Sequence, residues 1–83
     1  MKGIIAEINW KEKMVSVKTD TEGFSIFYIL GDDKLNAGDE ITWEEERPLG
    51  HEHIKNLITG EEIEVFFENH QVRQGDVREL LLY

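Results

Sequence analysis

Apolar and polar positions alternate along most of this chain with the period of two that is typical of β-strands. In the first third, this alternation predicts strands over residues 4–8 and 15–18, with a short polar connection between them. The turn formers of residues 19–23 lead into an aromatic strand over residues 24–30, and the glycine that ends the turn can adopt the positive φ of a tight turn. This part of the chain therefore predicts a three-stranded meander.

The second half of the chain predicts three more elements and a tail. Residues 40–45 indicate a fourth strand in which the isoleucine and the tryptophan share one face. A second hairpin is expected from strands at 54–58 and 61–67, on either side of a Thr-Gly turn. The tail at 75–83 fits either a helical turn or a last short strand, because its apolar pattern is too short to separate the two.

Five or six short strands in 83 residues predict an all-β domain with a single modest core. Sandwiches usually need about 100 residues, so a small closed or partly open barrel is favoured. Closure would also remove the exposed edges that make small sheets prone to aggregation. The chain contains no cysteine, so its stability must come from packing rather than from disulfides.

The formal net charge of −9 is unevenly distributed. Residues 1–30 contain four lysines and four carboxylates, so all of the net negative charge lies in residues 31–83. Because nucleic-acid affinity depends on cationic side chains that neutralise phosphates, this balance disfavours a polyanion beyond the first third. The same negative field favours a basic partner.

Targeting signals are not evident in the sequence. No apolar run approaches the roughly 18 residues of a membrane-spanning helix, and the N-terminal segment lacks the successive parts of a secretory signal. We therefore expect a cytoplasmic protein without a membrane contact.

Three motifs, in their order and spacing, suggest a known family. The chain opens with Met1-Lys2-Gly3, and Asn9 closes the first expected strand. Residues 34–41 combine a leucine, a glycine and the entry to the fourth strand, and residues 47–50 precede a strand that ends at Asn56. Together these features resemble the cold-shock domain family, in a divergent form.

The resemblance covers about residues 1–60 and implies a five-stranded OB barrel over that range. Residues 61–83 then form a C-terminal strand and an apolar tail packed on the same single domain. The fold expected overall is a small five- to six-stranded OB-type barrel with a short C-terminal extension.

The resemblance also implies weak, non-enzymatic binding of single-stranded RNA or DNA by base stacking on the face of strands one to three. Most of the family's stacking aromatics are lost in this chain. Glu7 occupies the family's first-strand tryptophan position, and residues 13–16 occupy its Gly-Phe-Gly-Phe run.

The third strand keeps one aromatic at a stacking position of the family. If Gly23 matches the family's turn glycine, the resemblance places Phe27 outward and Phe24, Ile26 and Tyr28 in the barrel core. A slip of one residue exchanges the two faces, because strand side chains alternate with period two.

The candidate nucleic-acid-binding residues are Trp10, Lys11, Lys13, Lys18 and Phe27. Trp10 lies in a polar connection, where an indole is more often a half-buried cap than a ligand contact. Phe27 could alternatively cover the end of the barrel or pack under the C-terminal tail.

The only apparent metal motif is His51-Glu52-His53, whose two imidazoles would project from one face of a strand, with His70 as a possible third ligand. Zinc sites need three or four ligands in a fixed geometry, so we expect no metal. The sequence also contains no Gly-rich phosphate loop, no nucleophile elbow and no cysteine nucleophile. We expect no cofactor and no enzymatic activity.

The alternative function is an acidic protein-protein interaction module that has lost nucleic-acid binding and takes a basic protein partner. The tail supplies apolar side chains that either pack over the barrel and cover the family's binding face or form a partner or homodimer interface. These side chains are Phe66, Phe67, Val72, Val77, Leu80, Leu81, Leu82 and Tyr83.

Overall fold

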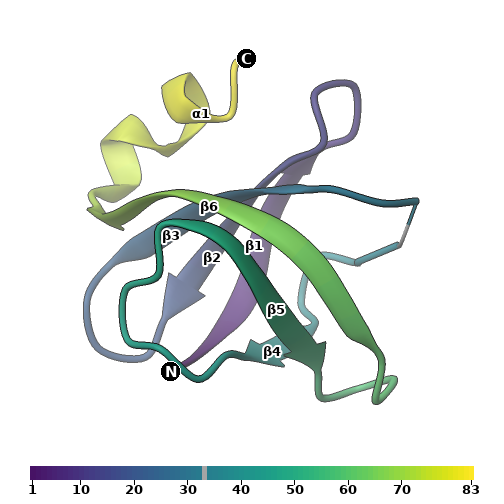
Figure 1. The fold of residues 1–83 in the computed structure, drawn as a ribbon. Coiled ribbons are helices and arrows are strands. Elements are labelled where there is room, and N and C mark those ends of the chain that lie inside the picture. Colours follow the sequence, from purple (N-terminus) through teal and green to yellow (C-terminus); the bar gives the residue numbers. More distant parts are fainter. Residues whose placement is uncertain (33) are drawn as a thin grey trace.

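The computed structural model describes residues 1–32 and 34–83 and is a closed, six-stranded antiparallel barrel with one short C-terminal helix (Figure 1). The predicted all-β fold, a small barrel with a C-terminal extension, is confirmed. The strands are β1 (Lys2–Asn9), β2 (Met14–Thr19), β3 (Phe24–Ile29), β4 (Glu40–Thr42), β5 (Gly50–Asn56) and β6 (Glu62–Val72). The tail forms a 3₁₀ turn, η1 (Gln74–Asp76), followed by α1 (Val77–Leu80). Within the described residues, no helix combines the length and the apolar character needed to cross a bilayer.

The strand order around the barrel is β1-β2-β3-β6-β5-β4, and β1 closes the ring by pairing with β4. β6 lies between β3 and β5 and pairs with both along much of its length. Without β6 the barrel would stay open between these strands. The barrel therefore runs past the expected boundary at residue 60 and ends at Val72.

The fifth strand begins and ends earlier than the predicted 54–58. β5 stops at Asn56 because the side chain of that residue organises a turn: its Oδ1 accepts the backbone N–H groups of Ile58 (2.8 Å) and Thr59 (3.3 Å). Its Nδ2 donates to Asp39 Oδ2 at 3.0 Å, which fixes the turn against the segment before β4. An asparagine that bonds backbone groups two and three residues ahead is a common turn former.

The fourth strand is shorter than the predicted 40–45. Beyond Thr42, the backbone of Trp43 pairs with the N-terminal residue instead: its N–H donates to Met1 O at 3.0 Å, and the Met1 amino group donates to Trp43 O at 2.9 Å. Ile41 and Trp43 share one buried face, as predicted.

The barrel interior holds one apolar cluster to which every strand contributes. It consists of Ile5, Val15, Val17, Phe27, Ile29, Leu35, Ile41, Trp43, Ile54, Ile63, Val65 and Phe67. The close approach of β1 to β2 depends on Gly3, since a Cβ there would lie 2.4 Å from Val17 Cγ1 and 2.8 Å from Lys18 O.

A second cluster lies outside the barrel, between β2, β3, β6 and the tail. Met14 and Ile26 from the sheet and Val77 and Leu81 from the tail are buried in it, together with Val72. Partly buried Phe24, Tyr28 and Leu80 surround the cluster. The tail is thus a helical turn rather than a strand, and it packs on its own barrel.

Candidate binding surfaces

The orientation predicted for β3 is wrong. Phe27 has an exposed fraction of 0% and lies inside the barrel, edge-on to Phe67 with ring centroids 5.2 Å apart. It pairs in register with Val15 of β2, and paired residues of neighbouring strands point to the same face. Ile26 and Tyr28 lie on the opposite, outer face, beneath the tail. Phe27 is therefore not available for base stacking in this structure.

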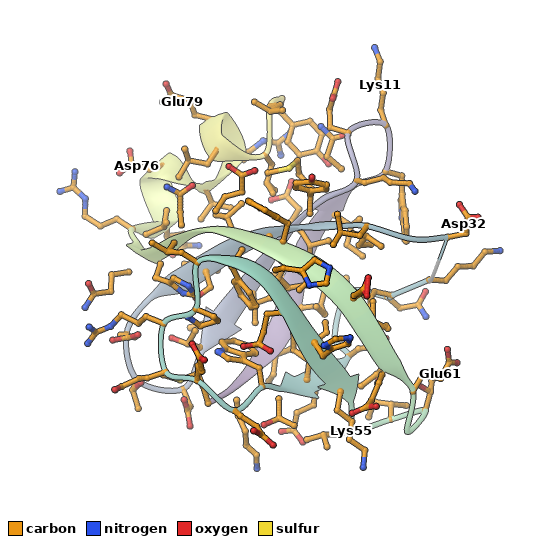
Figure 2. The ribbon with its side chains drawn as sticks, in the orientation of Figure 1. Lys11, Asp32, Lys55, Glu61, Asp76 and Glu79 are labelled. Carbon is orange, nitrogen blue, oxygen red and sulfur yellow. The ribbon has the colours of Figure 1, made fainter. Side chains whose placement is uncertain are left out.

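The other predicted site residues divide between the two ends of β2. Trp10, Lys11 and Lys13 lie together on the β1–β2 turn, and Figure 2 shows Lys11 extending from its tip into solvent. Lys18 lies at the far end of β2, where it pairs with Ile4 and Phe24. The five candidates consequently do not form one surface.

The β1–β2 turn carries a small aromatic groove. Trp10 is 49% exposed and lines a shallow depression of about 320 Å³ with Lys34, Leu35 and Asn36. Lys34 was not among the predicted site residues, because it is remote from Trp10 in sequence and meets it only in the folded barrel. The Lys13 ammonium group already has one hydrogen-bond partner, since its Nζ donates to the carbonyl of Gly31 at 2.7 Å.

The tail covers part of the outer face of β1, β2 and β3, where the family resemblance places nucleic acid (Figure 1). The far end of this face stays open, around Ile4, which is 50% exposed, and Lys18, and both residues line a depression there. Asn9 Nδ2 donates to Leu81 O at 2.8 Å across this contact, in a buried position. At the end of the chain, Tyr83 Oη donates to Ile8 O at 3.0 Å, and the Arg78 guanidinium lies 4.5 Å from the centre of the Tyr83 ring. A ligand could reach the covered part of this face, near the β1–β2 turn, only by displacing these contacts.

The opposite half of the barrel is acidic. Residues 40–68, which form β4, β5 and most of β6, contain nine carboxylates against one arginine and one lysine. Most of these carboxylates are exposed, including residues 44–46 and three on the outer face of β6. The arginine, Arg47, is already paired: its Nε lies 3.1 Å from Glu22. Lys55 is thus the single lysine on a strongly negative surface.

The two histidines of β5 are exposed on this acidic surface, on either side of one carboxylate. His51 Nε2 lies 3.3 Å from Glu64 Oε2, and His53 Nε2 lies 3.7 Å from Glu64 Oε1. The possible third ligand, His70, lies elsewhere: its Nδ1 is 2.8 Å from Ser25 Oγ, and its Nε2 contacts Pro48 O. No group of three or more His, Asp or Glu side chains within residues 1–32 and 34–83 is arranged to hold a metal ion.

Comparisons with known proteins identify no relative. No protein-family model matches the chain, and neither curated proteins nor solved structures include a match. The cold-shock resemblance stays a prediction from sequence motifs, and function has to be inferred from the surfaces described above.

Proposed function

We propose that this chain is a non-enzymatic binding domain whose acidic surface, formed by residues 40–68, binds a basic protein partner. The observation that carries the proposal is the separation of the two halves of the barrel. One half is partly covered by the chain's own tail, whereas the other exposes most of nine carboxylates with Lys55 as the only cation not tied to a carboxylate elsewhere. Such a surface attracts cationic partners and repels polyanions.

The test is a titration of the amide NMR spectrum with a lysine-rich peptide, first at low salt and then at about 0.15 M salt, where exposed charges are screened beyond roughly 8 Å. We expect shifts on β4, β5 and β6 that weaken as salt rises. An acidic peptide of equal length is the control. Reversing the charges of residues 44–46 to lysine should weaken binding roughly tenfold, since each exposed ion pair contributes about 0.2–1 kcal/mol.

A pair of double variants separates site from net charge: Glu44→Lys with Glu45→Lys in the loop after β4, and Asp76→Lys with Glu79→Lys on the tail, change the net charge by the same amount. Asp76 and Glu79 lie on the tail, away from Lys55 (Figure 2). If the tail double variant weakens binding as much as the loop double variant, the attraction depends on net charge alone and the acidic surface is not a specific site.

The second candidate function is weak binding of single-stranded RNA or DNA at the aromatic groove. The observation in its favour is the half-exposed Trp10 beside Lys34, a combination of ring and cation that suits base stacking and phosphate contact. Stacking contributes about 1–3 kcal/mol per base, so one ring gives low affinity.

Oligonucleotides of about eight nucleotides, within the usual OB site size, test this second candidate in the same NMR experiment. Shifts centred on the β1–β2 turn that disappear in Trp10→Ala would support it. A spectrum unchanged at low salt would exclude it, because phosphate attraction is strongest there.

A further inference from the structure

One edge of β5 has no neighbouring strand over most of its length. β4 pairs with β5 only at Ile41↔Asn56 and Thr42↔Lys55, whereas β6 accompanies β5 from Lys55 back to Gly50. The ring of strands is thus complete at one end of β5 and split along the rest. Unpaired strand edges are the places where a further strand can add.

The backbone groups of two histidines face this split. Leu57 donates its N–H to Glu40 O at 2.8 Å on the β4 side, and successive residues of a strand alternate between its two edges. The N–H groups of His51 and His53 therefore point to the same side as that of Leu57. The acceptor for the His53 N–H is a side-chain oxygen rather than the carbonyl of a neighbouring strand: the N–H donates to Glu52 Oε1 at 2.8 Å.

The split exists because the chain after β4 is held away from β5. Trp43 pairs with the N-terminus, Arg47 bonds both carboxylate oxygens of Glu22 at 3.1 Å, and the carbonyl of Pro48 contacts His70. These contacts carry the connecting loop across the end of the barrel. Within the described residues, no backbone hydrogen bond joins this loop to the open edge of β5.

The split is a groove of about 470 Å³ with an acidic lining. Three carboxylates, those of Glu44, Glu52 and Glu62, line it against the single ammonium group of Lys55. None of the three has a cationic partner within 4.0 Å among the described residues. The groove therefore has negative charge left to pair with an incoming cation.

One residue that lines the groove also carries an unsatisfied donor. The indole of Trp43 lines the groove and is only 3% exposed, and its Nε1 hydrogen has no acceptor in the structure described. A buried N–H without an acceptor is destabilising. Because Trp43 lines the groove, the resonance of its indole N–H reports on a segment bound there.

We propose that the open edge of β5 binds an extended, basic segment of a partner protein by strand addition. The segment pairs its backbone with His51 and His53, and its Lys or Arg side chains lie against Glu44, Glu52 and Glu62. This inference rests on the proposed function, because it identifies the basic partner's binding element and its site. In the free protein the Glu52 carboxylate occupies the position of one incoming carbonyl, which protects the edge from non-specific pairing.

The experiment uses the full chain and two peptides of about five residues, the length of the open edge at roughly 3.3 Å per residue. The first alternates Lys and Val with blocked ends. The second has the same sequence but carries an N-methyl group on every backbone nitrogen, so it keeps the charge and has no N–H to donate from either edge of its strand. We expect the first peptide to shift the amides of His51 and His53 and the Trp43 indole N–H, and the second to bind at least fivefold more weakly.

Protein variants then test the acidic lining. Glu44→Gln and Glu62→Gln should each weaken binding of the first peptide about 1.5- to 5-fold, in line with exposed ion pairs, whereas Glu79→Gln on α1 should leave it unchanged. Glu52→Gln keeps an acceptor for His53 N–H while it removes the charge, so its loss of affinity reports charge rather than edge geometry.

The outcomes separate this inference from the proposed function. Equal binding of both peptides, or shifts confined to other acidic residues, would overturn strand addition and leave the acidic binding surface intact. If neither peptide binds at low salt, both proposals fail. Selective binding of the unmethylated peptide at the β5 edge supports both.

Discussion

Replacement of Phe27 with alanine tests the central assignment of β3, in which this ring is core rather than binding surface. The ring is fully buried and contacts Phe67 inside the barrel. Removal of a buried phenylalanine costs about 3–5 kcal/mol, including the cavity left behind. A domain of this length has a total unfolding free energy of roughly 4–12 kcal/mol, at about 0.05–0.15 kcal/mol per residue. Phe27→Ala should therefore remove a large share of the stability.

Phe66→Ala is the matched control, because it removes the same side chain from the outer face of β6. Its ring is 37% exposed and stacks on Tyr28 at 5.5 Å, so we expect a smaller loss of about 1.5–3 kcal/mol from its partial burial and the aromatic pair together. Urea unfolding of both variants, followed by circular dichroism, gives the two free energies of unfolding. If Phe27→Ala does not fold, Phe27→Leu should still lose more stability than Phe66→Leu.

Equal losses for the two positions would refute the assignment of Phe27 to the core. The reasoning would also fail if Phe27→Ala kept its unfolding midpoint and lost affinity for single-stranded oligonucleotides. That result would mean that the ring faces outward as a stacking platform, as the family resemblance implies.

Three further predictions concern the tail, a close approach and a turn. Leu81→Ala should lower the free energy of unfolding by about 2–5 kcal/mol and speed amide hydrogen exchange in the tail. Leu82→Ala, at a side chain that is 61% exposed, should change that free energy by less than about 0.5 kcal/mol. Equal rates of hydrogen exchange in the two variants would contradict the packing of the tail. Gly3→Ala should lower the melting temperature, since the new Cβ would lie 2.8 Å from a backbone oxygen. In Gly75→Ala the new Cβ meets no atom within 4 Å, so the melting temperature should stay unchanged or rise. Asn56→Ala removes three hydrogen bonds of about 0.5–1.5 kcal/mol each. Chemical denaturation should therefore show a combined loss of several kcal/mol in the free energy of unfolding. A loss below about 1 kcal/mol would mean that the turn forms without this side chain.

The sequence alone was sufficient to predict the all-β barrel. Alternation with period two, short segments and frequent turn formers are local features, and strands respond to them wherever they lie in the fold. The meander and the second hairpin were predicted for the same reason, although the observed bounds of β5 differ from the predicted ones. There the decisive contacts were made by the Asn56 side chain, and one of them reaches a residue remote in sequence.

The orientation of β3 could not be obtained in this way. Its sequence, FSIFYI, has apolar residues on both faces, so alternation fits either orientation. Both faces are in fact covered, one by the barrel and the other by the tail. Only the register Val15↔Phe27 decides which face points inward, because a shift of one residue exchanges every side chain between the two.

The candidate surfaces also combine features that the sequence determined with features that only the fold determined. The sequence determined that the second half of the chain is acidic, since charge is a property of composition. Only the tertiary structure determined that the tail covers part of the face of β1 to β3, that Lys34 lies beside Trp10, and that β4 leaves the edge of β5 open. These features depend on contacts between segments far apart along the chain, and such contacts arise when the barrel closes.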